Sequence, residues 1–242
     1  MGKARELAQR YGAGLQTVVF LGPDGRFLGR YEPEKLYDAG DPERLLKEMR
    51  AAHEERKRVD AGGIPPPLEG GERLGKPLPA WEPDGWLQGR RESLASLRGK
   101  VVLVRFFTDT CPFCDASMPA LAALHERHRA AGLETLGFYH PKPRGAARDA
   151  EGVRRLLASW EVAFPVALDT RWKTLEAWWL QGAPRRATSV TFLLDRKGAV
   201  RFLHPGPELH PGEEGCNLVP EDCNRSFADL EAAVEKLLAE DA

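Results

Sequence analysis

The sequence predicts an α/β fold, and three observations support that fold class. Residues 101–107 form an almost continuous apolar run, which is typical of a strand buried on both faces. A helix pattern follows, in which Met118, Leu121 and Leu124 recur on one helix face. Strand and helix patterns then alternate toward the end of the chain, as they do in α/β domains.

Length and charge narrow the class of protein. A chain of 242 residues allows one large domain, or one domain with an added module. The formal net charge is −1 and charges of both signs are interleaved, so we expect neither a nucleic-acid partner nor a membrane surface. The sequence contains no transmembrane run, and its charged beginning lacks the apolar core of a signal peptide. We therefore expect a cytoplasmic protein, or a periplasmic one if the true N-terminus lies upstream.

The chain divides into three predicted segments. Residues 1–60 are predicted to form a short helix, a hairpin whose strands flank the turn signal Gly-Pro-Asp-Gly at 22–25, and a second helix. Residues 61–79 are a Gly/Pro-rich linker, and residues 80–242 form the main domain. The strand beginning at Gln16 aligns with the one beginning at Ser189, which suggests an internal repeat.

The most informative motif is Cys111-Pro112-Phe113-Cys114, where the apolar strand ends and the helix begins. A helix N-terminus stabilises a thiolate and lowers the pKa of the first cysteine. Two intervening residues bring the sulfurs within reach of a reducible disulfide, which indicates a redox dithiol. Zinc would need a second ligand pair in register, and a c-type haem would need histidine where Asp115 stands. Two inert buried thiols remain the other alternative.

A second group of candidate residues lies in the Gly/Pro-rich loop before the last helix. His204, His210, Cys216 and Cys223 are of types that suit Zn²⁺, but their spacing matches no zinc finger or ribbon. A Cys216–Cys223 disulfide or two free thiols is therefore favoured, as a second thiol pair. We expect no cofactor and no metal.

The segments around the first motif resemble the TlpA-type redoxins of the thioredoxin superfamily. The resemblance covers about residues 74–205 and rests on ordered motifs at 94–104 (LASLRGKVVLV), 106–114 (FFTDTCPFC), 164–169 (FPVALD) and 191–198 (TFLLDRKG). It implies a thioredoxin-like fold, with a central mixed sheet flanked by helices. It also implies that Cys111 is the attacking thiolate and Cys114 the resolving thiol. By the same resemblance, residues 1–60 would be half of a second thioredoxin unit without its own dithiol, docked on the main domain or continuing a chain that starts upstream.

Three positions depart from the family pattern. Ser189 follows Thr188 where the family has a cis-proline, so we expect a trans bond and a hydroxyl near the sulfurs. Arg105 stands where thioredoxins bury an acidic group. Its charge would favour a Cys111 thiolate but could not accept a proton, and the alternative is that it reaches solvent or pairs with a carboxylate. Thr110 replaces a tryptophan, so substrate docking would differ.

These observations predict a thiol–disulfide oxidoreductase. Its expected partners are a disulfide-containing protein or small thiol and an electron donor that the sequence does not identify. One alternative is a thiol peroxidase, because Thr108 and Cys111 supply a T-x-x-C pattern, although Val104 replaces the upstream proline of that motif. The other alternative is a redox-regulated binding module, which the missing cis-proline favours.

Overall fold

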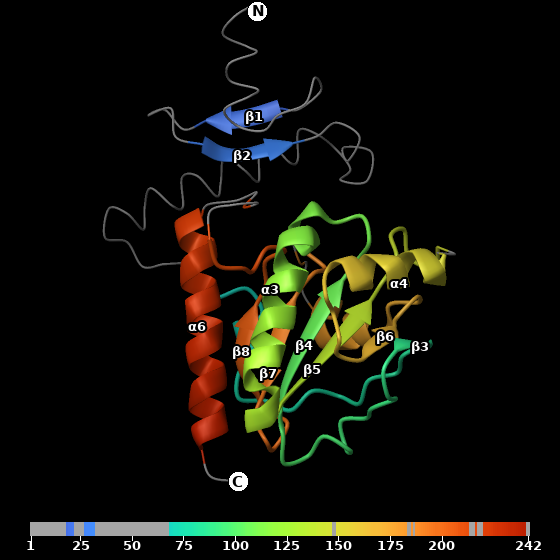
Figure 1. Cartoon of the computed structure of the whole chain (residues 1–242), viewed down its shortest axis with the longest axis vertical. Coiled ribbons are helices and arrows are strands. Elements are labelled where there is room, and N and C mark those ends of the chain that lie inside the picture. Colours follow the sequence, from blue (N-terminus) through green and yellow to red (C-terminus); the bar gives the residue numbers. More distant parts are fainter. Residues whose placement is uncertain are drawn as a thin grey trace, which may run out of the picture. The chain divides into compact units, whose positions relative to one another are not determined.

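The computed structural model describes the strands 18–21 and 27–31, and residues 68–146, 149–182, 185, 187–212, 216 and 220–240 (Figure 1). The chain forms two compact units, one of residues 1–68 and 217–219 and the other of residues 69–216 and 220–242. In the smaller unit, β1 (Val18–Leu21) pairs antiparallel with β2 (Phe27–Tyr31). The expected hairpin is therefore present, and the helices predicted around it lie outside the described residues.

The described part of the larger unit contains a six-stranded mixed sheet in the order β3–β6–β5–β4–β7–β8. Strands β4, β5 and β6 run parallel, whereas β3, β7 and β8 pair antiparallel with their neighbours. The strands are β3 (Gly85–Gln88), β4 (Val101–Phe107), β5 (Leu133–Tyr139), β6 (Val166–Leu168), β7 (Thr191–Leu194) and β8 (Val200–His204). This arrangement confirms the predicted α/β class.

Helices cover both faces of the sheet. The long ones are α3 (Pro112–His128), α4 (Ala150–Ser159) and α6 (Pro220–Ala239), which lie in front of the sheet in Figure 1. The short ones are η2 (Gly71–Arg73), η3 (Arg129–Ala131), α5 (Lys173–Leu175) and the π-helical turn η4 (Glu176–Leu180). No helix among the described residues is both long and apolar enough to cross a lipid bilayer.

Strand β4 lies at the centre of the sheet, and all its residues are buried. Because successive side chains of a strand point to opposite faces, β4 contributes side chains to the hydrophobic cores on both faces of the sheet. Val102, Val104 and Phe106 join an aromatic core with Trp178 of η4. Val101, Leu103 and Phe107 pack on the face covered by α3, α4 and α6. By the same alternation, Arg105 belongs to the face against which α3 packs.

Residues 69–79, which the sequence analysis assigned to the linker, belong to the larger unit. Gly75 N donates to Val200 O at 2.8 Å, and Val200 N donates to Lys76 O at 3.0 Å. These bonds pair the segment with the outer edge of β8, where unpaired backbone groups would otherwise be exposed. The division of the whole chain into three segments stays a prediction.

Candidate active site

The two cysteines of the first motif occupy different environments at the start of α3. Cys111 is the N-cap residue, with extended backbone (φ −109°, ψ 108°), and Pro112 opens the helix, a position that suits proline. Cys114 N donates to Cys111 O at 2.9 Å, which places Cys114 one turn inside. Cys114 is fully buried, whereas Cys111 and Phe113 are partly exposed. Cys111 is therefore the sulfur that a substrate can reach.

Ser189 brings a hydroxyl group to both sulfurs. Its Oγ lies 3.5 Å from Cys114 Sγ and donates to Cys111 Sγ at 3.9 Å. The Thr188–Ser189 bond is trans, as expected, since the cis bond found among the described residues is Lys142–Pro143. Ser189 lies two residues before β7. Because β7 is the neighbour of β4 in the sheet, and the dithiol follows the end of β4, Ser189 comes to lie beside the two sulfurs.

Arg105 is fully buried beneath the dithiol. Its Nη1 donates to Ser189 O at 2.9 Å and to Thr191 Oγ1 at 3.0 Å, and its Nη2 donates to Pro207 O. Arg105 therefore does not reach solvent, and these acceptors are all neutral. A buried cation is costly unless a negative charge compensates it, and a thiolate of the neighbouring cysteine pair can do so.

The electrostatics of the two thiols are coupled. The hydrogen bond from Cys111 lowers the pKa of Cys114 despite burial, and the Arg105 charge and the Ser189 hydroxyl lower this pKa further. The same hydrogen bond, burial and the charge on Cys114 raise the pKa of Cys111. The pair therefore loses its first proton at a lowered pKa and its second at a raised one.

This distribution differs from the sequence-based expectation of a low pKa at Cys111 alone. The main reason is the hydrogen bond between the two thiols; the Arg105 charge acts on both of them, and Ser189 Oγ lies nearer to Cys114 Sγ than to Cys111 Sγ. The two sulfurs share the remaining proton after the first is lost, because the apparent pKa values of a coupled pair belong to the pair and not to either thiol. When it lies on Cys114, the accessible Cys111 carries the negative charge.

Alkylation is expected to distinguish the two thiols by access. Limiting iodoacetamide added to the reduced protein at mildly acidic pH should modify Cys111 well before Cys114, because Cys111 is partly exposed and Cys114 is buried. Peptide mass spectrometry measures the order of labelling, with full modification after unfolding as the control. Preferential labelling of Cys114 in the folded protein would contradict this account.

His140 is a neighbour of the site that sequence reasoning missed. Its Nε2 lies 2.8 Å from Thr188 Oγ1, and its backbone N donates to Phe107 O at 2.9 Å. Burial lowers the pKa of His140 to about 3, so the ring is neutral at physiological pH. The signal was available, since His140 directly follows β5 and parallel neighbours end at the same sheet edge. The ring fixes Thr188, the residue before Ser189.

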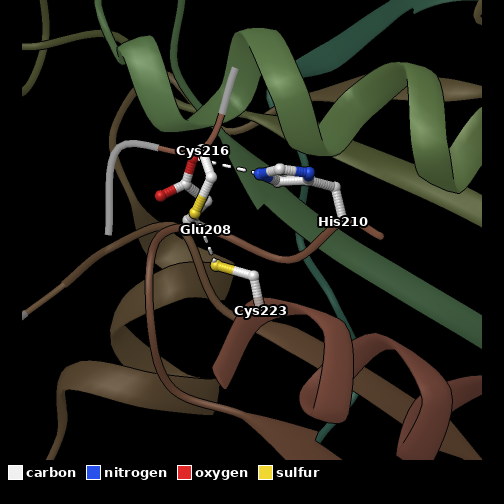
Figure 2. A group of neighbouring side chains, drawn as sticks. All are labelled: Glu208, His210, Cys216 and Cys223. Carbon is white, nitrogen blue, oxygen red and sulfur yellow. Dashed lines mark hydrogen bonds and ion pairs between the residues drawn. The ribbon is translucent and has the colours of Figure 1, made fainter. Parts of the chain in front are cut away.

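Three of the four residues in the second candidate group also lie close together. His210, Cys216 and Cys223 come together with Glu208, whereas His204 ends β8 outside this group (Figure 2). Cys216 Sγ and Cys223 Sγ lie 3.3 Å apart and are not joined by a disulfide bond. Glu208 was not predicted from the sequence, because a lone carboxylate in a loop belongs to no recognisable motif.

Comparison with known proteins places the chain in a family. A family model described as Redoxin matches residues 73–215, more than half of the sequence, so the chain belongs to the redoxin family. Protein DipZ of Mycobacterium tuberculosis is 28% identical over 131 residues, covering 50% of this chain and 17% of DipZ. Thiol-disulfide oxidoreductase ResA of Halalkalibacterium halodurans is 24% identical over 120 residues, covering 50% of this chain and 62% of ResA. The chain thus spans less than two thirds of the length of either relative.

A solved structure supports the fold. A putative protein disulfide isomerase from Bacteroides thetaiotaomicron aligns with a TM-score of 0.53 at 24% identity, covering 69% of this chain and 91% of that one. Together with the mixed sheet flanked by helices, this likeness confirms the expected thioredoxin-like fold. The family match and the relatives also confirm the resemblance to TlpA-type redoxins.

Proposed function

We propose that this chain is a thiol–disulfide oxidoreductase, in which Cys111 attacks a substrate disulfide and Cys114 resolves the intermediate. The observation that carries this proposal is the accessible Cys111 sulfur beside the buried Cys114 sulfur, with the Arg105 cation and the Ser189 hydroxyl beneath them. The similarity to ResA of Halalkalibacterium halodurans, a thiol-disulfide oxidoreductase, supports it.

The exchange proceeds in two substitutions at sulfur. The Cys111 thiolate attacks one sulfur of the substrate disulfide, and the other substrate sulfur leaves as a thiolate. Cys114 then loses its proton and attacks Cys111 Sγ, which releases the second substrate sulfur. Two electrons pass from the dithiol to the substrate, the two thiol protons end on the released sulfurs or on water, and a Cys111–Cys114 disulfide forms.

Arg105 contributes to this reaction through its positive charge and does not transfer a proton. A guanidinium has no acceptor and stays protonated in proteins, so it cannot take the Cys114 proton. Its positive charge stabilises the thiolate that attacks and the thiolate character that develops on Cys114. Proton acceptance then falls to the leaving substrate thiolate, which is basic enough for that task.

We propose that the substrate is a disulfide in a protein or small molecule, and that a separate donor reduces the enzyme again. Cys111 lies at the surface end of the motif, where an extended substrate segment can approach it. The cytoplasmic location expected from the sequence stays a prediction, which fractionation of the native cells would test.

Two assays separate this function from the peroxidase alternative. We expect the protein to accelerate insulin reduction by dithiothreitol, and to consume hydrogen peroxide no faster than a variant without the motif, Cys111→Ser/Cys114→Ser. Peroxide turnover without insulin reduction would contradict the proposal and favour a peroxidase. Inactivity in both assays, with oxidation-dependent binding of a protein, would instead favour a redox-regulated binding module.

Ser189 is expected to tune the rate. Ser189→Ala removes the hydroxyl that lies against both sulfurs, so the thiolate loses one hydrogen bond and the rate at neutral pH should fall about threefold to tenfold. Ser189→Thr retains a hydroxyl and should remain closer to the parent. The readout is the pH profile of insulin reduction, whose midpoint should move to higher pH in Ser189→Ala. An unchanged midpoint would show that the hydroxyl does not act on the thiolate.

A further inference from the structure

A cluster of four potential metal ligands lies apart from the proposed catalytic dithiol. Glu208, His210, Cys216 and Cys223 each offer one ligand atom, and these atoms all lie within 4.8 Å of one another. Figure 2 shows the four side chains converging from the loop after β8 and from α6. The side chains of Glu208 and His210 are at most 4% exposed, so this is an interior site rather than a surface group of acids.

The histidine is oriented for coordination. His210 Nδ1 lies 3.1 Å from Pro211 O, an atom that can only accept, so the contact places the ring proton on Nδ1. His210 Nε2, the nitrogen that is free to coordinate in the neutral ring, lies 3.2 Å from Glu208 Oε1. A nitrogen and an oxygen bound at about 2.0–2.1 Å to one tetrahedral ion lie about 3.3 Å apart, so the spacing of these two atoms fits coordination of a common cation. Donation of the second ring nitrogen to a carbonyl is the usual support of a metal-bound histidine.

The part of the loop that carries Glu208 and His210 is held at two points. Leu209 N donates to Ser117 Oγ of α3 at 2.8 Å, and Gly212 N donates to Asn224 Oδ1 of α6 at 2.6 Å. Cys223 belongs to the first turns of the same helix α6. The fold therefore holds the positions of Glu208, His210 and Cys223 before any ion binds, which reduces the ordering cost of binding.

We propose that Glu208, His210, Cys216 and Cys223 form a tetrahedral site for Zn²⁺. Two thiolate sulfurs, one imidazole nitrogen and one carboxylate oxygen are a donor set that zinc accepts. Sulfurs bound at about 2.3 Å to a tetrahedral ion lie about 3.8 Å apart. Cys216 Sγ and Cys223 Sγ lie 3.3 Å apart, so a small outward movement of the two sulfurs creates the site.

The donor set also argues for the class of ion. Thiolates disfavour Mg²⁺ and Ca²⁺, which prefer oxygen ligands, and the tetrahedral Cys₂His set with a carboxylate suits a borderline-soft ion such as Zn²⁺. The proposal revises the expectation, drawn from spacing alone, that the chain holds no metal. The sequence spacing of the four ligands did not indicate a metal site, because three of them come from an irregular loop and the fourth from a helix.

A metal ion in this site would stabilise the backbone segment that contacts residues next to the dithiol. Pro207, directly before the ligand Glu208, accepts a hydrogen bond from Arg105. Leu209, directly after Glu208, is held by Ser117, which lies one turn beyond Cys114 in α3. An ion bound by Glu208 therefore fixes the backbone that positions the Arg105 cation, and it does so without taking part in the exchange.

The test uses the full chain carrying Cys111→Ser and Cys114→Ser, so that the catalytic thiols cannot bind metal. After reduction and removal of metal, Co²⁺ is titrated in as a spectroscopic probe and then displaced by Zn²⁺. We expect one Co²⁺ per chain with the intense visible absorption of a tetrahedral thiolate complex. Adding Cys223→Ser should weaken binding by more than about 100-fold, and Glu208→Gln by about tenfold or more. A matched control, His128→Gln, alters a histidine that lies against Glu231 of α6 and should bind Co²⁺ like the parent.

A second measurement does not depend on the variants folding. In the same background, Zn²⁺ should protect Cys216 and Cys223 from alkylation, and a chelator should restore their labelling. Absence of a stoichiometric Co²⁺ complex in the reduced protein would overturn the proposal. So would binding that survives Cys223→Ser, or labelling of both cysteines that Zn²⁺ does not change. A stable Cys216–Cys223 disulfide whose reduction yields no metal binding would identify the second thiol pair as a simple redox pair.

Discussion

Replacing Cys111 with serine is expected to reduce insulin-reduction turnover by about a thousandfold or more, to the uncatalysed rate. The serine hydroxyl is not ionised at neutral pH and cannot form the mixed disulfide on which the exchange depends. The fold should survive, because Cys111 is the partly exposed N-cap residue and its side chain makes no capping bond to the helix. Turnover and thermal unfolding measured on the same preparation check both statements.

The matched control for this variant is Ser159→Ala, which alters an exposed side chain at the end of α4. It should retain the parental rate. Turnover of Cys111→Ser above a few per cent of the parent, with the control unaffected, would show that another group performs the attack.

Replacing Arg105 with methionine is expected to move the pH profile of the reaction to higher pH. The Arg105 charge lowers the pKa of Cys114 and opposes the rise in the pKa of Cys111. Removing the cation therefore raises the pH at which the pair loses its first proton, and the thiolate fraction below that pH falls about tenfold for each unit of the shift. Arg105→Lys keeps a positive charge and should recover part of the lost rate.

The same substitution is expected to lower the reduction potential of the Cys111–Cys114 couple. The Arg105 cation stabilises the reduced thiolate form and has no such partner in the disulfide, so it makes the disulfide a stronger oxidant. Each tenfold loss of stabilisation should lower the potential by about 30 mV. Equilibration with glutathione redox buffers measures it, and Arg127→Met, an exposed arginine paired with Glu231, is the control. A potential that rises, or stays equal to that of the control, contradicts the assigned role of Arg105.

Much of the site followed from the sequence because its parts are consecutive in the chain. The apolar run of β4 and the helix pattern of α3 determined where Cys111 and Cys114 would lie, and the fold class followed from the alternation of elements. The two-residue period of β4 also places Arg105 on the α3 face, so its burial near the dithiol was available to sequence reasoning. The hydroxyl of Ser189 near the sulfurs followed from the family resemblance.

What the sequence did not predict depends on contacts between distant segments. The hydrogen bond between the two thiols, together with the Arg105 charge and the Ser189 hydroxyl, sets how the negative charge is shared, and no local pattern encodes these contacts. The contact of His140 with Thr188 joins two loops at one sheet edge. Glu208 lies close to Cys223 because of the path of the loop after β8. The Gly- and Pro-rich sequence of this loop has no hydrophobic periodicity from which that path could be predicted.

The central claim is that Cys111 attacks and Cys114 resolves, and trapping the intermediate tests it most directly. Cys114→Ser, incubated with a protein disulfide substrate and analysed by peptide mass spectrometry without reductant, should accumulate a mixed disulfide between Cys111 and a substrate cysteine. The parent protein should release the substrate and show the Cys111–Cys114 disulfide instead. A trapped adduct on Cys216 or Cys223, or no adduct on Cys111 in a folded variant, would contradict the account.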